Sequence, residues 1–243
     1  MKTAILCGKL FDSQNNQVST DKVIIVEDKA ICDVIDRREF AENPDMEVID
    51  LSNLFVTPGL IDLHVHSGMN GEGNDRMGLL QHTVGELTLY SLKNVQQDLY
   101  AGFTTIRDCG SQAFVSVAIR DAINKGDFIG PRMFVSGYSM GSTGGHADSH
   151  YAPGTYNPAE ERPIIDGPDS ARKAARYNLK HGADFLKFMA TGGVMSKGTT
   201  VGSQQLCDDE IAAIIEIAHM YGVHTATHAH GTNGIKAAVR AGV

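Results

Sequence analysis

Histidine pairs occur at two places in this 243-residue sequence, and both have the spacing of a metal-binding site. His64 and His66 stand at the end of the apolar stretch 60–65, and His228 and His230 stand at the end of the stretch 223–228. Side chains two residues apart on a strand point to the same face, so each pair can present two imidazoles to one ion. Neutral imidazole suits zinc, but buried histidines bonded to backbone carbonyls would give the same pattern.

A single lysine, Lys187, stands inside the apolar stretch 184–190. A buried ammonium group is costly, so this lysine has to be neutral, paired or chemically modified. A bond to a carboxylate, a Schiff base with a substrate and carbamylation by carbon dioxide would each meet that requirement. The residue alone leaves all three open.

Alternating strands and helices must position these residues. Apolar and helical periodicity predicts strands at 60–65, 103–108, 131–136, 184–189 and 223–228, and helices at 84–99, 114–125, 171–181, 208–221 and 231–241. Gly102, Gly182 and Gly222 each stand between a helix and the next strand, and Gly242 begins the same pattern again. We expect these glycines to take the left-handed conformation that ends a helix.

The alternation predicts a parallel sheet covered by helices. No nucleotide-binding glycine loop follows any predicted strand, which argues against a doubly wound sheet. Candidate ligands at the carboxyl ends of several strands favour a (β/α)₈ barrel, whose active site lies there. About five of the eight units of such a barrel are visible, so we expect the chain to be an N-terminal portion of a longer protein.

The first part of the chain has a different pattern. Short strand-like runs at 2–6, 22–26, 30–35 and 47–51 are separated by polar turns, without helical periodicity. We therefore expect two domains, a β subdomain at 1–56 and the first part of the barrel at 57–243.

The stretch 57–66, Thr-Pro-Gly-Leu-Ile-Asp-Leu-His-Val-His, resembles the metal-binding signature of the amidohydrolase superfamily. The loop 191–196, Thr-Gly-Gly-Val-Met-Ser, joined to the strand of Lys187, is similar to the branch with imidazolonepropionase-like and prolidase-like enzymes, such as Xaa-Pro dipeptidases and Xaa-Arg/Lys carboxypeptidases. The resemblance implies an amidohydrolase-type TIM barrel and, for the N-terminal segment, part of a β-sandwich.

The resemblance also implies a ligand set. It assigns two divalent metal ions, which we expect to be zinc, to His64, His66, His228 and a Lys187 carbamylated by carbon dioxide.

Further residues are implied to meet the substrate. His146, in Thr-Gly-Gly-His at 143–146, is expected to point at the scissile carbonyl, and it joins Lys187 as a catalytic candidate. His230 and Tyr151 are expected to bind substrate. Asp108, at the end of the second barrel strand, fits both a helix cap and a group that supports a metal ligand.

The implied activity is hydrolysis of an amide or peptide bond in a small substrate, a dipeptide or a C-terminal residue, by metal-activated hydroxide. Two alternatives stay open: a single-metal cyclic-amide hydrolase of the imidazolonepropionase type, and a truncated, inactive metal-binding fragment. Lys187 beside Gly192 and Gly193 argues against the single-metal enzyme, which needs no bridging lysine.

Composition limits the partners. A net charge of −8 and a pI of about 5.6 argue against nucleic acid or an anionic membrane. The apolar run at 4–7 is too short for a signal peptide, and no apolar stretch approaches the length of a transmembrane helix. We expect a cytoplasmic protein, and a homo-oligomer, because an open barrel leaves a sheet edge uncovered.

Overall fold

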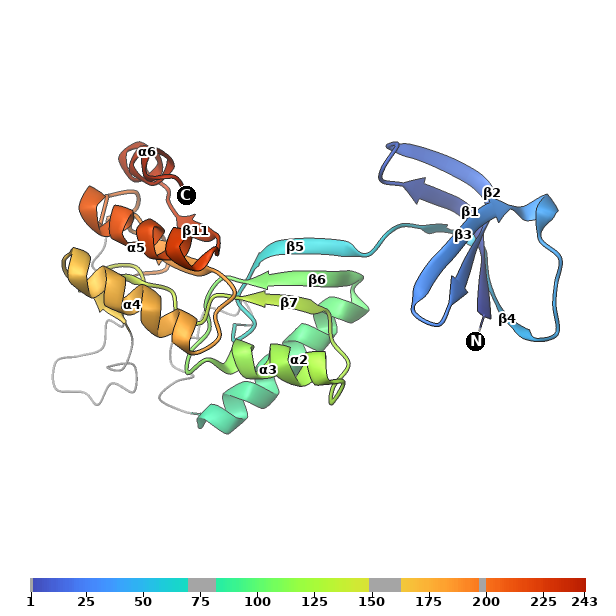
Figure 1. Cartoon of the computed structure of the whole chain (residues 1–243), viewed down its shortest axis with the longest axis horizontal. Coiled ribbons are helices and arrows are strands. Elements are labelled where there is room, and N and C mark those ends of the chain that lie inside the picture. Colours follow the sequence, from blue (N-terminus) through green and yellow to red (C-terminus); the bar gives the residue numbers. More distant parts are fainter. Residues whose placement is uncertain (1, 70–81, 149–162, 197–199) are drawn as a thin grey trace. The chain divides into compact units, whose positions relative to one another are not determined.

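A computed structural model of the chain describes residues 2–69, 82–148, 163–196 and 200–243. Tyr151, which the sequence predicts to bind substrate, lies outside the described residues. The chain divides into two compact units, Met1–Gly59 and Leu60–Val243, and each is described here by itself (Figure 1). The predicted domain extents 1–56 and 57–243 stay a prediction.

The first unit is a four-stranded sheet with the strand order β3-β2-β1-β4. Its elements are β1 (Lys2–Asp12), β2 (Gln17–Glu27), β3 (Ala30–Asp36), the short helix η1 (Arg37–Glu39) and β4 (Met46–Val56). β1 pairs antiparallel with β2 and parallel with β4. The described residues of this unit form one sheet, and a β-sandwich remains a prediction.

The turn between β1 and β2 explains why both strands are longer than predicted. The Asp12 carboxylate accepts hydrogen bonds from the backbone N–H groups of Gln14 and Asn15, at 2.9 and 3.2 Å. Local side-chain bonds of this kind stabilise a tight turn. The two strands therefore stay paired up to Asp12 and Gln17 instead of ending near 6 and starting near 22.

The second unit alternates strands and helices, as predicted (Figure 1). Its elements are β5 (Leu60–Val65), α2 (Val84–Tyr100), β6 (Phe103–Asp108), α3 (Val115–Lys125), β7 (Arg132–Val135), β8 (Gly141–Ser142), β9 (Ile164–Ile165), α4 (Pro168–Lys180), β10 (Leu186–Met189), α5 (Asp208–Tyr221), β11 (Thr225–His228) and α6 (Thr232–Ala241). All strand pairs among these described elements are parallel. Closure into a barrel remains a prediction.

Three boundaries of this unit differ by two residues or more from those predicted. α4 begins at Pro168 rather than at 171, because a proline at the first helical position needs no N–H partner and already has helical φ. β10 and β11 begin at Leu186 and Thr225, later than the predicted 184 and 223. The two-residue strands β8 and β9 were not predicted.

The predicted left-handed glycines are confirmed. Gly102, Gly182, Gly222 and Gly242 have φ values of 100°, 91°, 67° and 97°. An L-amino acid with a side chain is strained in this region, whereas glycine is not. The helices before Gly102, Gly182 and Gly222 therefore end within one residue of the predicted positions, and the chain continues to β6, β10 and β11.

The sheets β5-β6-β7 and β10-β11 are joined by contacts outside the regular ladder. Asp184 exchanges two hydrogen bonds with Val135: its backbone N–H donates to the carbonyl at 2.7 Å, and its carboxylate accepts from the Val135 N–H at 2.9 Å. Arg120 of α3 forms an ion pair with the same carboxylate at 2.7 Å. Further along the chain, Met140 forms a parallel bridge with Phe188.

The third strand of this unit is thus interrupted between Val135 and Met140. Asn178 of α4, which is fully buried, bonds to the backbone within this interval. Its side-chain amide accepts a hydrogen bond from the Tyr138 N–H at 3.1 Å and donates to the Tyr138 carbonyl at 3.0 Å. Buried backbone groups are costly when unpaired, so Asn178 allows the chain to leave the sheet here.

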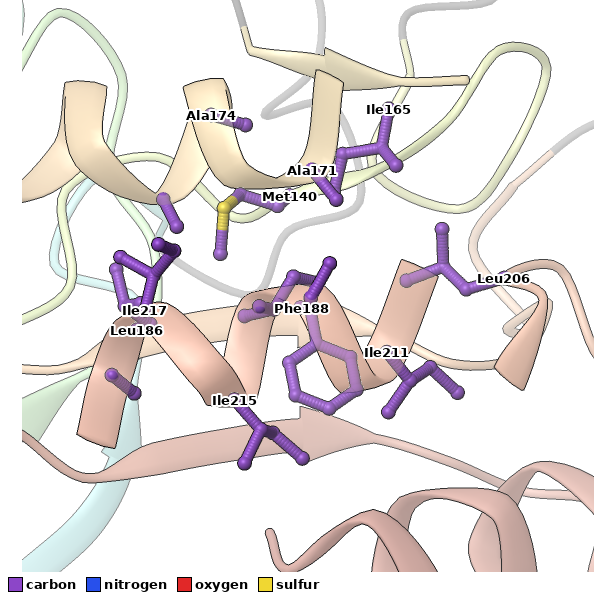
Figure 2. Close-up of a cluster of buried hydrophobic side chains, with 14 of the residues drawn as sticks. Met140, Ile165, Ala171, Ala174, Leu186, Phe188, Leu206, Ile211, Ile215 and Ile217 are labelled. Carbon is purple, nitrogen blue, oxygen red and sulfur yellow. The ribbon is translucent and has the colours of Figure 1, made fainter. Parts of the chain in front are cut away.

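Two clusters of buried apolar side chains hold the helices on the strands. One joins α2, α3, β6 and β7 around Val95, Ile106 and Val135. The larger one joins α4, α5 and β10, and Figure 2 shows Ala171, Phe188 and Ile211 among its members. Burial of aliphatic and aromatic side chains contributes roughly 1.5–3 kcal/mol for each large residue, so these clusters fix the strands that carry the candidate site.

Candidate metal centre and active site

The carboxyl ends of the parallel strands bring together residues that are far apart in the sequence. Lys187, on β10, is only 1% exposed, and its Nζ lies 3.4 Å from Nε2 of His64 on β5. The ring of His66 lies 5.3 Å, centroid to centroid, from that of His64. The first predicted histidine pair and the predicted lysine therefore meet at one place.

His66 is held by the chain beyond β6. Its Nδ1 lies 2.9 Å from the carbonyl oxygen of Gly110. A carbonyl only accepts hydrogen bonds, so Nδ1 carries the proton, and in the neutral ring Nε2 has the lone pair. A histidine that ligates a metal usually has its other ring nitrogen bonded to a carbonyl or carboxylate in this way.

Asp108 connects the two segments on either side of His66. Its fully buried carboxylate accepts hydrogen bonds from the backbone and the hydroxyl of Ser67 and from the N–H of Gly110, the last at 2.9 Å. Ser67 follows His66 directly, and Gly110 supplies the carbonyl that orients it. The sequence left two roles open for Asp108, a helix cap and support of a metal ligand. These contacts fit support of the segment that carries His66.

His228, His146 and His230 form a second group of rings. The ring of His228 lies 4.4 Å from that of His146 and 4.7 Å from that of His230. Nε2 of His228 is buried and has no hydrogen-bond partner among the described residues. A buried nitrogen without a partner is costly, so it marks a position at which a bound group would be stabilised.

Burial disfavours the charged forms of three of these groups. It lowers the pKa of His64 to about 4, with further contributions from the charges of Lys187 and His66. Burial also lowers the pKa of His228 to about 4, followed by the charges of His230 and Lys187. The pKa of Lys187 is lowered by burial as well. Neutral imidazoles and a neutral amine are the forms that bind a metal or react with an electrophile.

Arg107 of β6 and Cys109, which directly follows β6, both contact β5. The Arg107 Nε–H donates to the carbonyl of Leu63 at 2.7 Å, and the Cys109 thiol lies 3.6 Å from the same oxygen. Cys109 is 1% exposed, and burial raises the pKa of its thiol. These contacts fit a structural thiol, because a raised pKa disfavours the reactive thiolate.

The donor set fits a metal, with one limit. Within the described ranges, no group of three or more His, Cys, Asp or Glu side chains is arranged to hold an ion. The candidate set depends on Lys187, whose amine is not a metal ligand until it is deprotonated or modified. The ligand roles of His64, His66, His228 and Lys187 therefore stay predictions.

Sequence reasoning missed the residues that hold His146. Gln205 accepts a hydrogen bond from the His146 backbone N–H at 2.8 Å, and the Ser196 hydroxyl bonds to His146 Nδ1. The His146 ring occupies the space that a Cβ at Gly193 would need, since that atom would lie 2.4 Å from its Cε1. In the sequence, the glycine pair 192–193 was the one feature that indicated a close approach of another group to this loop.

Comparison with known proteins decides the family. Residues 55–243 match the family described as the amidohydrolase family. The chain belongs to the amidohydrolase family. This member is similar to the ochratoxinase of Aspergillus niger, with 32% identity over 203 residues, which cover 77% of this chain and 42% of that protein. The chain thus spans less than half the length of this curated relative.

Solved structures of similar fold also include a dipeptidase and a prolidase. This amidohydrolase has 33% identity and a TM-score of 0.88 to a Xaa-Pro dipeptidase with bound methionine in its active site, and covers 60% of that chain. A prolidase complexed with N-methylphosphonate-L-proline gives 28% identity, a TM-score of 0.86 and the same share of its length. Among the described residues, no helix is long and apolar enough to cross a bilayer.

Proposed function

We propose that the protein hydrolyses an amide or peptide bond of a small substrate, a dipeptide or a C-terminal residue, with the help of two divalent metal ions. The observation that carries this proposal is the position of the buried Lys187 amine, 3.4 Å from Nε2 of His64. Membership of the amidohydrolase family and the likeness to a Xaa-Pro dipeptidase, a prolidase and an ochratoxinase support the reaction class.

His64, His66, Lys187 and His228 would hold the ions, which we propose to be zinc. His66 presents Nε2, because Nδ1 donates to Gly110, and His228 has a buried Nε2 without a partner among the described residues. When bound, such ions polarise a carbonyl group and lower the pKa of water, which supplies a nucleophile near neutral pH.

Lys187 would carry a carbamate. Its lowered pKa favours the neutral amine, which has the lone pair needed to attack carbon dioxide. The nitrogen forms a bond to the carbon, one electron pair of a C=O bond moves to oxygen, and the nitrogen loses a proton to solvent. The product would be an anionic oxygen ligand next to His64.

His146 and His230 would meet the substrate. Both rings neighbour that of His228, so a carbonyl bound near His228 lies within reach of either imidazole. His146 would contact the scissile carbonyl and His230 another part of the substrate. Tyr151 was predicted to join them, and it lies outside the described residues.

The test uses protein expressed from the complete gene. We expect about two divalent ions per chain, a carbamate signal from Lys187 in NMR with isotopically labelled carbon dioxide, and hydrolysis within a panel of proline-ended dipeptides, other dipeptides and N-acyl amino acids. A single ion and an unmodified Lys187 would favour the cyclic-amide hydrolase. Bound metal without turnover on any amide would indicate an inactive metal-binding protein.

A further inference from the structure

We propose that Ser196 is a positioning residue, whose hydroxyl fixes the ring of His146 beside His228. The inference rests on the proposed function, because it concerns the orientation of a group that would touch the substrate. It was not foreseen from the sequence, where Ser196 is one of several small polar residues in a loop.

The hydroxyl of Ser196 contacts His146 twice. Its Oγ forms a hydrogen bond with Nδ1 of the ring and lies 3.3 Å from the backbone carbonyl oxygen of His146, and its single proton can be donated to one of these two atoms at a time. One hydroxyl thus links the ring to its own backbone. A side chain held at both its base and its ring loses rotamer freedom before substrate arrives, which lowers the entropy cost of the productive geometry.

Gln205 fixes the backbone that carries this ring. Its side-chain oxygen accepts from the His146 N–H at 2.8 Å, and its own N–H donates to the carbonyl of Ala190 at 2.9 Å. Ala190 follows β10, the strand of Lys187, so the backbone of His146 is tied to the strand end that carries the proposed metal ligand.

Gly193 provides the surface on which the ring rests. A Cβ at this position would lie 2.4 to 2.8 Å from three atoms of the His146 ring. Contacts this short do not occur in folded proteins, so the position requires glycine while the ring stays in place. The ring is therefore bounded by Ser196, by the Gly193 backbone and by the ring of His228.

The arrangement selects one nitrogen for the reaction. When the Ser196 hydroxyl donates to Nδ1, the neutral ring carries its proton on Nε2, which can then donate to a substrate carbonyl. Loss of the Ser196 hydroxyl would remove one contact that orients the ring without removing any proposed metal ligand. The effect should fall on turnover rather than on metal binding.

The experiment compares three variants of the protein expressed from its complete gene. Ser196→Ala removes the hydroxyl, and Ser196→Thr keeps it. Ser203→Ala is the matched control, because the hydroxyl of this exposed serine donates to the local backbone carbonyl of Thr200, at 2.7 Å. We expect Ser196→Ala to lower kcat by roughly 10- to 100-fold with unchanged metal content, the cost typical of a misplaced group. Ser196→Thr should restore most of the rate, and Ser203→Ala should match the wild type.

A second readout does not depend on activity. The nitrogen NMR signal of labelled His146 Nδ1 should shift in Ser196→Ala and stay near its wild-type position in Ser203→Ala. An unchanged signal, or wild-type kcat and KM in Ser196→Ala, would overturn the inference. A wild-type protein without metal and without turnover would instead refute the proposed function, and the NMR comparison would still decide the role of Ser196.

Discussion

The amine of Lys187 lies 3.4 Å from the imidazole of His64, although 123 residues separate the two in the sequence. No carboxylate forms an ion pair with this lysine among the described residues, and the histidine that it contacts is itself a candidate metal ligand. A buried amine beside a histidine has no anionic partner, so it does not form a structural ion pair. A negatively charged ligand would be stabilised at such a site.

Replacement of Lys187 by alanine should remove the proposed bridging ligand. We expect loss of at least one metal ion per chain and a fall in kcat of more than about 100-fold. Residues that only hydrogen-bond to a metal ligand typically change metal affinity or activity by about 10- to 100-fold, and a direct ligand should matter more. Elemental analysis and amide hydrolysis measure both. Lys180→Ala, at the exposed end of α4, is the control. Full metal content in Lys187→Ala would contradict the ligand assignment.

Asp108→Asn tests how the chain positions His66. The amide would keep the size of the side chain but would lose the charge that accepts from Ser67 and Gly110. We expect metal affinity to fall by about 10- to 100-fold, with His66 itself unchanged. Metal titration with a competing chelator gives the affinity, and Asp127→Asn, at an exposed position, should leave it at the wild-type value.

Acid should destabilise the metal-free protein in a defined range. His64 and His228 have pKa values lowered from 6.5 to about 4, so in the folded chain both rings stay neutral down to that pH. In the unfolded chain they take up protons near pH 6.5, so the unfolded state binds more protons between these limits. Stability should be greatest above pH 6.5 and should fall as the pH drops toward 4. Thermal unfolding after chelation at pH 7 and pH 5 measures this loss. A melting temperature that does not change would argue against buried neutral histidines.

Glu210 should matter for stability and not for chemistry. Its buried carboxylate accepts from the backbone N–H of Cys207, before α5, and of Gly167, before α4, at 2.7 and 2.6 Å. Glu210→Ala leaves both donors unsatisfied, so we expect a loss of about 1–3 kcal/mol in the free energy of unfolding. Glu216→Ala, which breaks an exposed ion pair of α5 with Arg172, should cost less than about 1 kcal/mol in the same urea titration. Equal losses in the two variants would show that burial of Glu210 adds nothing.

Much of the second unit could be predicted from periodicity. The order of strands and helices and the left-handed glycines follow from local patterns, because helix ends and apolar strands are encoded within a few residues. The proximity of His64, His66 and Lys187 followed from one topological rule, that parallel strands place their carboxyl ends together. The family was also predicted from short motifs, and the match of residues 55–243 confirms it.

The remainder depends on contacts between distant segments. The Asn178–Tyr138 bonds and the Ser196–His146 bond join loops to helices and other loops across 40 and 50 residues. Neither residue type nor spacing marks such partners, because serine and asparagine bond equally well to solvent or to local backbone. The sequence likewise does not show that the Asp108 carboxylate accepts hydrogen bonds from both Ser67 and Gly110.

The Asn178 amide also has a consequence for the order of folding. The backbone N–H and carbonyl of Tyr138 bond to the side chain of Asn178, so these two bonds cannot form until α4, which follows in the chain, has formed and docked. Closing a contact over 40 residues costs loop entropy. In a newly made chain, we therefore expect the segment at Tyr138 to wait for α4 before these two bonds are made.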